Sequence, residues 1–486
     1  MSRNSPDRHD VLSEAALKES FPGYTGQITA SKRLSARAAD IVPAESVLRE
    51  DLAARLDNDL YRHQADGLEA LANDENVVVT TSTSSGKTRI YALQTARNRL
   101  DDPDATALCI YPMKALTRDQ ETTLNDRFNE WGIDTRVEVY DGDTKASRKR
   151  SIRAGADTVL TNPAGLNVYL PRHSTDSGWP RFYNNLELVV VDEAHQYSGV
   201  MGTHVAWILR RLRRLLSYYD ADPQFVMTTA TIGNPAQHAE RLTSETFTVI
   251  DEDGSPRGER DIVLWKPPVD ESALQEAREN DVDPADVGIE EFRVSTGSEA
   301  AEITAHLAVN DRQTLQFCTA RQGTEIAARK IGGAAREHPR DNYVETRAYH
   351  GGLGKRTRRG IENQLQTGAV DAVASTNALE LGIDIGGIDA TVTSGYPGTR
   401  QSFWQQIGRA GRGTTDALSV LVGGADAMDS YILDNPSYLF EDDVEDAVVS
   451  IDNEQVYADH LCVAAKERPL SGEDAGVLGD EERLAE

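Results

Sequence analysis

Two short groups of residues have the composition and spacing of a site that hydrolyses a nucleotide. The first is SSGKT at residues 84–88, which follows the β-branched run VVVTT and precedes an amphipathic segment at 89–100. A strand that leads into the amino end of a helix presents unpaired N–H groups and the positive end of the helix dipole to one point, where phosphate groups bind. Lys87 adds a positive charge there, and the Thr88 hydroxyl is a ligand for Mg²⁺. The predicted phosphate-binding residues are Thr81, Ser82, Ser84, Ser85, Gly86, Lys87 and Thr88, with Thr81 standing where this pattern usually has glycine.

The second group is the pair of carboxylates Asp192 and Glu193, at the end of the apolar run LELVVVD. Asp192 is placed to hold Mg²⁺ through water, and Glu193 to orient and deprotonate the water that attacks the γ-phosphate. Since the carboxyl ends of parallel strands meet at one edge of a sheet, we expect both carboxylates to lie near Lys87. Together the two groups predict ATP hydrolysis with Mg²⁺.

The elements that position these residues are predicted from an alternation of apolar runs with amphipathic segments. Such runs suit strands covered on both faces by helices, which indicates an α/β fold with mostly parallel sheets. The alternation stops between about 251 and 298, where prolines and an acidic segment occur, and then resumes. The predicted strands are VVVTT, TALCIYP, RVEVY, DTVLTN, LELVVVD, FVMTTAT and FTVI before the pause, and TLQFCTA, VETRAYH, VDAVAST, IDATVTSGYP and ALSVLVG after it.

A chain of 486 residues is too long for one hydrophobic core, so we expect several domains. The prolines and acidic residues of the pause indicate an interdomain connection. The predicted parts are a polar amino-terminal extension at 1–45, an ATP-binding domain at 46–250, the connection at 251–298, a second α/β domain at 299–428 and a helical carboxyl-terminal extension at 429–486.

The chain is acidic, with a net charge of −28 from 51 Lys and Arg against 79 Asp and Glu. A protein that binds nucleic acid is normally basic. Either the partner is therefore not a nucleic acid, or a basic groove persists within an acidic surface. Scarce lysine beside arginine, with abundant aspartate, is typical of a protein adapted to a salty cytoplasm, as in haloarchaea. Basic clusters at 145–150, 210–214 and 354–359 are either parts of such a groove or solvated helix faces.

The cysteines and the apolar runs exclude several classes of protein. Cys109, Cys318 and Cys462 lie far apart without a CxxC pair, so they predict neither a zinc site nor a disulfide framework. No apolar run approaches the length of a membrane span, and the amino terminus lacks the apolar core of a signal peptide. We therefore expect a soluble cytoplasmic protein with no membrane partner.

Five ordered motifs resemble those of superfamily 2 helicases of the DEAH type: GKT at 86–88, DEAH at 192–195, TAT at 229–231, ASTNALELGID at 374–384 and QQIGRAGR at 405–412. The stretches LYRHQ, SGYPGTRQSFWQQIGRAGR and LDNPSYLF are similar to those of the Hrq/YprA-like repair helicases. This resemblance implies two tandem RecA-like domains with a short helical extension. It also implies an ATP-dependent DNA helicase or translocase that moves 3′ to 5′ on single-stranded DNA and acts in DNA repair.

The resemblance assigns further residues to the nucleotide. It implies that Gln64 recognises the adenine edge, and the alternative is an exposed polar residue on a helix. Arg409 and Arg412 resemble arginine fingers, which stabilise charge that develops on the γ-phosphate in the transition state. The other residues implied to contact the nucleotide are Gln405, Gly382 and Asp384. The residues implied to couple the nucleotide to the nucleic acid are Thr229, Thr231 and His195. A plain turn at the end of a strand would also favour the two threonines.

A nucleic-acid track is implied along both domains, where short polar side chains and helix amino ends hold phosphates without reading bases. Since such contacts do not select the sugar, single-stranded DNA, tailed duplex DNA and RNA are all candidate substrates. A motor without strand separation is another alternative, and so is a non-catalytic scaffold, against which Lys87 and Glu193 argue. The track candidates are Pro112, Lys114, Thr161, Asn162, Thr319, Arg321, His350, Gly351 and Thr376.

The same family carries a cysteine-rich, zinc-binding domain beyond its helicase core, and no such segment is present in this sequence. We therefore expect no zinc in this chain. We also expect either a shortened form or a protein partner that supplies the domain.

Overall fold

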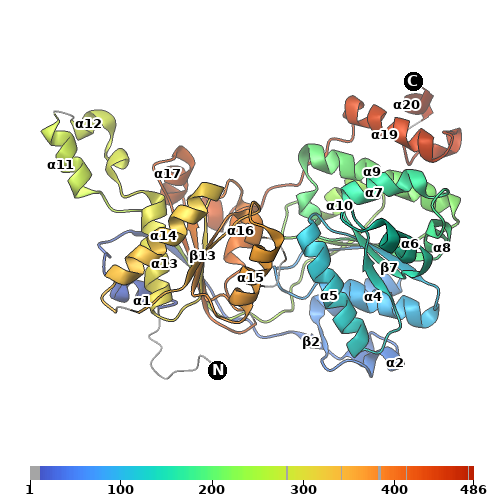
Figure 1. The fold of residues 1–486 in the computed structure, drawn as a ribbon, viewed down its shortest axis with the longest axis horizontal. Helices are drawn as coiled ribbons and strands as arrows, with labels where there is room; N and C mark the ends of the chain where they lie inside the picture. Colours follow the sequence, from blue (N-terminus) through green and yellow to red (C-terminus); the bar gives the residue numbers. More distant parts are fainter. Residues whose placement is uncertain are drawn as a thin grey trace. The chain divides into compact units, whose positions relative to one another are not determined.

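The computed structural model describes residues 11–280, 283–340, 342–380, 382, 385–411, 413–479 and 481–485. The chain divides into two compact units (Figure 1). The first unit comprises Asp40–Ser255 and Val444–Glu486, and the second comprises the residues up to Ala39 with Pro256–Asp443. Each unit contains one seven-stranded sheet flanked by helices, and the predicted α/β class with mostly parallel sheets is confirmed.

The sheet of the first unit is parallel throughout, in the order β10-β4-β9-β8-β5-β7-β6. Its inner strands are largely apolar and buried because helices cover both faces, whereas the edge strands β10 and β6 are partly exposed. Since only β9 separates β4 from β8, the loops that follow β4 and β8 leave the same edge of the sheet. The strands are β4 (Val77–Val79), β5 (Thr106–Ile110), β6 (Val137–Val139), β7 (Thr158–Thr161), β8 (Leu186–Val191), β9 (Gln224–Thr228) and β10 (Thr248–Ile250).

The helices between residues 88 and 243 connect these strands, as parallel pairing requires. A short antiparallel ribbon of β2 (Ile41–Val42) and β3 (Leu60–Tyr61) precedes them. The helices are α2 (Glu50–Ala53), α3 (Arg62–Ala72), α4 (Thr88–Asp101), α5 (Lys114–Glu130), α6 (Ala146–Gly155), α7 (Pro163–Tyr169), α8 (Trp179–Asn184), α9 (Gly199–Tyr218), α10 (Pro235–Thr243), α19 (Glu454–Glu467) and α20 (Glu481–Ala485).

The sheet of the second unit has the order β1-β11-β16-β15-β12-β14-β13, in which only the edge strand β1 is antiparallel to its neighbour. Along β1 half-buried and exposed residues alternate, as is typical of an edge strand with one wetted face. The strands are β1 (Ile28–Leu34), β11 (Arg260–Trp265), β12 (Thr314–Phe317), β13 (Thr346–Tyr349), β14 (Ala372–Ser375), β15 (Ala390–Ser394) and β16 (Ala417–Val422).

Helices flank the sheet of the second unit, with α13 and α14 lying side by side, whereas α11 and α12 project away from the sheet (Figure 1). The helices are α1 (Glu14–Ser20), α11 (Glu271–Glu279), α12 (Pro284–Val287), α13 (Thr296–Val309), α14 (Arg321–Glu337), α15 (Lys355–Gln366), α16 (Arg400–Ile407), α17 (Ala427–Asp434) and α18 (Ser437–Phe440). No helix in the described parts of the chain is long and apolar enough to cross a membrane.

Every apolar run predicted as a strand between residues 77 and 422 forms one, but two strands of the second sheet were not predicted. Residues 251–298, expected to be a connection, contain β11, which lies between β1 and β16. The amino-terminal extension likewise contributes β1, which pairs with β11. These predictions were wrong because β1 is polar and edge-exposed, and because the prolines and acidic residues that follow β11 obscured its short apolar run.

The predicted carboxyl-terminal extension, residues 429–486, is also divided differently from the expectation. The helices α17 and α18 remain with the second unit, whereas the chain from Val444 onward belongs to the first unit. There α19 packs on α9, and Tyr457 contacts Trp207 with ring centroids 4.9 Å apart. Two arginines of the basic cluster at 210–214 face this segment, since Arg211 pairs with Glu467 and Arg214 with Asp474. These two arginines are therefore buried structural residues, not part of a solvated basic face.

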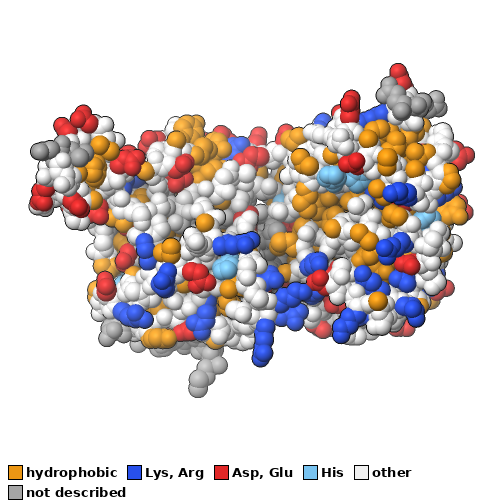
Figure 2. Space-filling view, turned by 45° about the horizontal axis from the view of Figure 1, so that its top comes forward, with side chains coloured by type: hydrophobic (Ala, Val, Ile, Leu, Met, Phe, Trp, Pro, Cys, Tyr) orange, Lys and Arg blue, Asp and Glu red, His pale blue; other side chains and the backbone are white. Residues whose placement is uncertain are grey.

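Lysine and arginine side chains gather in patches on the face shown in Figure 2, although the chain as a whole carries a charge of −28. The acidic excess is therefore not spread evenly over this surface. This distribution agrees with the alternative of local basic regions within an acidic protein.

Candidate nucleotide site and nucleic-acid track

The predicted phosphate loop lies between β4 and the amino end of α4, as its sequence indicates. Lys87 Nζ donates hydrogen bonds to the carbonyl oxygens of Thr81 and Ser82, both at 2.8 Å. Gly86 has a φ of +88°, and a Cβ atom at this position would lie 2.7 Å from Nε2 of Gln64. Glycine is therefore favoured at residue 86 by a backbone conformation that residues with a side chain rarely adopt.

Gln64 ties the phosphate loop to the first turn of α3. Its Oε1 accepts a hydrogen bond from the backbone N–H of Tyr61 at 3.1 Å, and its Nε2 donates to the carbonyl of Gly86 at 3.2 Å. The side chain is only 1% exposed, so the interpretation as an exposed polar residue is wrong. Its position beside the loop is compatible with the predicted contact to adenine, which stays a prediction.

Four hydroxyl groups of the loop, those of Thr81, Ser82, Ser85 and Thr88, take part in hydrogen bonds. The Thr81 and Ser85 hydroxyls lie 2.7 Å apart, and Thr88 Oγ1 accepts a hydrogen bond from the Tyr91 hydroxyl at 3.3 Å. Ser82 donates to Asp253 through both its N–H and its hydroxyl. The sequence predicted the loop residues but gave no indication of Asp253, which lies 171 positions from Ser82.

Asp192 and Glu193 follow β8 at the sheet edge where the phosphate loop follows β4. Asp192 accepts a hydrogen bond from the Thr228 hydroxyl, which in turn accepts one from the N–H of Glu193 at 3.2 Å. Burial, with the charge of Glu193, raises the pKa of Asp192 to about 7. The positive charge of Lys87 opposes this rise in the pKa.

Glu193 has the left-handed backbone conformation, with a φ of 51°, which is uncommon for a residue with a side chain. This turn directs the chain from β8 into the short helical turn that contains His195. Backbone strain of this kind persists where surrounding contacts enforce it, and it is frequent at functional sites. Here the hydrogen bond to Thr228 holds the residue in place.

His195 lies against the TAT segment, which was predicted to couple ATP to the nucleic acid. Its Nδ1 accepts a hydrogen bond from the N–H of Ala230 at 3.1 Å and lies 3.4 Å from the Thr229 hydroxyl. It also lies 3.6 Å from Oε2 of Glu193. Burial lowers the pKa of His195 to about 4, so the imidazole is neutral. The structure thus brings Glu193, His195 and Thr229 together, whereas Thr231 is exposed.

In the second unit, Arg409 is buried and holds the loop that follows β14. Its Nε and Nη2 donate to the carbonyl oxygen of Glu380 at 3.0 and 2.7 Å. Gln405 and Thr376 are also buried, and Gly382 is half-buried. Asp384 and Arg412, predicted as a nucleotide contact and an arginine finger, lie outside the described residues.

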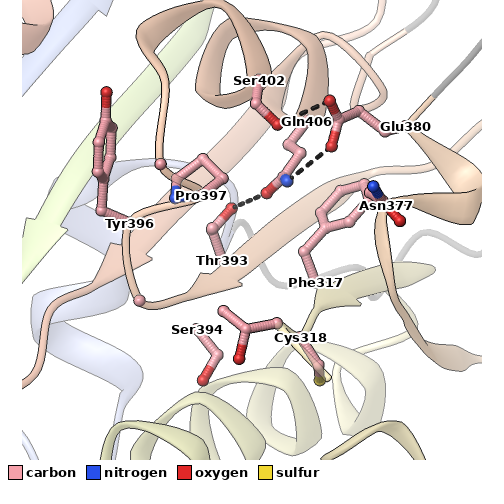
Figure 3. A pocket seen from close by; sticks show the side chains of 13 residues that line it. Phe317, Cys318, Asn377, Glu380, Thr393, Ser394, Tyr396, Pro397, Ser402 and Gln406 are labelled. Carbon is pink, nitrogen blue, oxygen red and sulfur yellow. Dashed lines mark hydrogen bonds between the residues drawn. The ribbon is translucent and has the colours of Figure 1, made fainter. Parts of the chain in front are cut away.

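A polar network around Glu380 was missed by the sequence predictions. The carboxylate accepts hydrogen bonds from the Ser402 hydroxyl at 2.6 Å and from Gln406 Nε2 at 3.0 Å, and Gln406 Oε1 accepts one from the Thr393 hydroxyl at 3.2 Å (Figure 3). Burial raises the pKa of Glu380 above its usual value. The signal that could have found this network is the position of Glu380 and Gln406 within the two motifs that resemble those of helicases.

The same network borders a cavity of about 280 Å³ at the carboxyl ends of β12 and β15. The track candidate Thr319 lines this cavity together with Ser394 and Tyr396. His350 lies 3.5 Å from Glu325 and accepts a hydrogen bond from the N–H of Gly352 at 3.1 Å. Arg321 and Gly351 are exposed, so these residues are accessible to a ligand.

In the first unit, the track candidates are already bound to their own neighbours. Lys114 Nζ lies 3.0 Å from Oδ1 of Asp143. The Thr161 hydroxyl donates to the carbonyl of Tyr140 at 2.8 Å, and Asn162 caps α7 by accepting from the N–H of Gly165 at 2.8 Å. Pro112 is half-buried next to α5. Thr161 and Asn162 therefore have structural roles, and Lys114 is the exposed cation among these four residues.

Comparison with protein families finds matches in both units. Residues 61–239 match the DEAD/DEAH box helicase family, and residues 299–414 match the helicase conserved C-terminal domain. The first match contains the phosphate loop and the paired carboxylates, and the second contains Glu380 and Arg409. Each matched segment therefore includes residues of the candidate site.

Long alignments connect this chain to named helicases. It is 35% identical to the uncharacterised ATP-dependent helicase YprA of Bacillus subtilis (strain 168), over 88% of this chain and 54% of that protein. It is 37% identical to the ATP-dependent helicase HRQ1 of Saccharomyces cerevisiae, over 85% of this chain and 38% of that protein. The chain thus spans about half the length or less of these relatives.

Solved structures agree with these alignments. A crystal structure of the DUF1998 helicase MrfA bound to DNA matches with a TM-score of 0.84 and 34% identity, over 94% of this chain and 59% of that one. A second structure, of MrfA bound to DNA and AMPPNP, matches with the same score and covers 61% of that chain. By its two family matches and its homology to YprA, HRQ1 and MrfA, the chain belongs to the DEAD/DEAH box helicases of superfamily 2, with two tandem RecA-like domains.

Proposed function

We propose that this chain is an ATP-dependent DNA helicase or translocase that uses Mg²⁺ and moves 3′ to 5′ along single-stranded DNA. The observation that carries the proposal is the placement of Lys87, Asp192 and Glu193 at one edge of the first sheet, where the charge of the lysine acts on Asp192. The relatives support the class of activity, since two are described as ATP-dependent helicases and MrfA was crystallised with DNA. A role in DNA repair belongs to the same proposal.

In this proposal, each residue at the sheet edge has one task. The N–H groups of the phosphate loop and Lys87 bind the β- and γ-phosphates, and Thr88 with Asp192 holds Mg²⁺, which neutralises phosphate charge. Lys87 would exchange its hydrogen bonds to the loop carbonyls for the phosphate oxygens. Glu193 takes the proton of the attacking water. Its backbone turn after β8 supports this role, because it directs the chain away from the strand directly after Asp192.

The second unit supplies the remaining groups of the proposal. Arg409 and Arg412 stabilise the charge on the γ-phosphate, while Gln405, Gly382 and Asp384 contact the nucleotide. His195 and Thr229 couple the nucleotide bound at Glu193 to the nucleic acid. Two contacts support this role: His195 lies beside Glu193 on one side and beside the Thr229 hydroxyl on the other. Lys114, Arg321, His350 and Thr319 hold phosphates of the strand.

The proposal is tested by measuring ATP hydrolysis in high-salt buffer without nucleic acid, with single-stranded DNA and with RNA. We expect stimulation by DNA, and a loss of at least about 100-fold in Lys87→Ala because the phosphate charge loses its main cation. Lys18→Ala, at an exposed lysine of the second unit, is the matched control and should retain full activity. Unchanged hydrolysis in Lys87→Ala would show that the phosphate loop is wrongly assigned.

A strand-displacement assay on duplexes with a 3′ or a 5′ tail separates the remaining alternatives. Displacement that requires a 3′ tail supports the proposed polarity. Robust DNA-stimulated hydrolysis without displacement would assign the chain as a translocating motor. If RNA stimulates ATP hydrolysis and DNA does not, the substrate is RNA and not DNA.

A further inference from the structure

Asp253 is a largely buried carboxylate at the point where the chain leaves the first unit. Its side chain is 11% exposed, and the first segment of the first unit, Asp40–Ser255, ends two residues later. A buried carboxylate is costly unless hydrogen-bond donors satisfy it. The donors that surround Asp253 are therefore informative about its role.

The carboxylate of Asp253 joins the phosphate loop to this exit segment. Its Oδ2 accepts hydrogen bonds from the hydroxyl and, at 3.4 Å, from the N–H of Ser82. Its Oδ1 accepts from the N–H and the hydroxyl of Ser255 at 2.9 and 2.6 Å. One side chain thus connects a residue of the proposed ATP site to Ser255, the last residue of the first segment of this unit.

Hydrogen bonds join the segment around Gly254, where the chain leaves the first unit, to the segment around Asp40, where the chain enters it. The carbonyl of Gly254 accepts from the N–H of Asp40 at 3.0 Å, and the carbonyl of Asp40 accepts from the N–H of Arg62 at 2.9 Å. The N–H of Gly254 donates to Nδ1 of His63 at 3.3 Å. The entering segment, the exiting segment and the start of α3 are therefore bonded backbone to backbone.

Gly254 is required for this close packing. A Cβ atom there would lie 2.7 Å from the backbone nitrogen and 2.8 Å from the Cβ of Arg62, closer than van der Waals contact allows. The junction therefore has little freedom to slide. A movement of Ser255 or Asp40 would be transmitted to α3, which also carries Gln64.

We propose that Asp253 is a positioning residue that couples occupancy of the phosphate loop to the segments joining the two units. A bound phosphate recruits N–H and hydroxyl donors of the loop, and Ser82 offers these same two donors to Asp253. Phosphate binding therefore competes with Asp253 for Ser82 and releases the carboxylate, which loosens its hold on Ser255. This inference rests on the proposed function, because it assumes that ATP binds the phosphate loop.

The competition is reciprocal, since two coupled equilibria shift one another by the same factor. Replacing Asp253 by asparagine keeps its size but weakens the charge-assisted hydrogen bonds to Ser82. We expect Asp253→Asn to bind ATP about tenfold more tightly, corresponding to the loss of one such bond. We also expect DNA to stimulate kcat less in this variant, because occupancy of the phosphate loop no longer affects the segments that join the two units.

The experiment measures KM for ATP and kcat, with and without single-stranded DNA, in the full chain and in Asp253→Asn. Asp251→Asn, at an exposed carboxylate two residues earlier, is the matched control and should change neither value. Ser82→Ala and the double variant complete a cycle, and a combined effect smaller than the sum of the two single effects supports direct coupling. Circular dichroism verifies that each variant is folded.

Two results would overturn the inference. One is an Asp253→Asn variant with unchanged KM and unchanged stimulation. The other is weaker ATP binding, which would make Asp253 a support of the loop and not a competitor for Ser82. Failure of the proposed function gives a different result from failure of this inference. In that case the unmodified chain would show no ATP hydrolysis that is lost in Lys87→Ala.

Discussion

Arg211 on α9 and Glu467 at the end of α19 form an ion pair between two fully buried side chains, 256 positions apart in the sequence. The Nε of Arg211 lies 3.0 Å from Oε1 of Glu467, and its Nη1 donates to Asn167 Oδ1 and His460 Nδ1. Burial raises the pKa of Glu467, and Arg211 opposes this rise. The pair fixes the carboxyl-terminal segment on the first unit.

Removing one partner of this pair is expected to destabilise the protein. Arg211→Met would leave Glu467 buried without its cation, which costs about 3–5 kcal/mol of the free energy of unfolding. Arg49→Met is the control, because the pairs of Arg49 with Asp51 and Asp101 are exposed and worth about 0–1 kcal/mol. Denaturant unfolding at one salt concentration measures both. Combining Arg211→Met with Glu467→Leu should recover most of the lost stability. Equal free energies of unfolding for Arg211→Met and Arg49→Met would contradict the prediction.

His460 makes the same contact sensitive to pH. Its Nδ1 accepts from Arg211 at 3.1 Å, and its Nε2 lies 3.0 Å from Nδ1 of His204. Burial, with the charge of Arg211, lowers the pKa of His460 to about 4. Between pH 6.5 and 4 the unfolded chain therefore binds a proton that the folded chain does not, and stability falls as the pH falls.

The variant His460→Asn tests this dependence, because asparagine can still accept a hydrogen bond from Arg211 but does not titrate. We expect its Tm to fall less than that of the unmodified protein between pH 7 and pH 5. The dependence should not vanish, since the pKa values of His195 and His306 are also lowered to about 4. Parallel curves of Tm against pH would exclude the role given to His460.

The pairing of Lys114 with Asp143 predicts a restraint on nucleic-acid binding. Asp143 lies 3.0 Å from Lys114 and 3.3 Å from Arg118, so it neutralises cations that a phosphate would otherwise meet. Asp143→Asn should tighten binding to single-stranded DNA about 3- to 10-fold and steepen the dependence of log K on log salt concentration by about one. Fluorescence anisotropy over a salt series measures both quantities. Asp51→Asn should change neither, and identical salt slopes for Asp143→Asn and the unmodified protein would refute the prediction.

Glu193 is predicted to act in hydrolysis and not in binding. Glu193→Gln keeps the hydrogen bond from its backbone to Thr228 but cannot accept the proton of water. We expect kcat to fall by about 100-fold or more, while the affinity for ATP changes little. Single-turnover hydrolysis and equilibrium binding of a fluorescent ATP analogue separate the two effects. A parallel loss of affinity would assign Glu193 to nucleotide binding instead.

The sequence by itself determined the elements whose signals are local. The phosphate loop could be located because a strand, a small-residue loop and a helix follow one another within residues 77–101, and the paired carboxylates because they end an apolar run. Because the carboxyl ends of parallel strands meet at one edge of a sheet, the sequence also predicts that Lys87 lies near Asp192. Apart from β11, the strands between 77 and 422 were predictable for the same reason, since strands covered by helices on both faces form apolar runs.

Only the tertiary structure decided the contacts made across long sequence separations. No local pattern indicates that β1 pairs with β11, that Glu467 returns to Arg211 or that Asp253 reaches Ser82. These contacts depend on which distant surfaces become buried together, and a carboxylate has the same local signature whether it is solvated or buried beside a donor. The sequence therefore determined the chemistry of the proposed ATP site. The fold decided which residues connect that site to the rest of the chain.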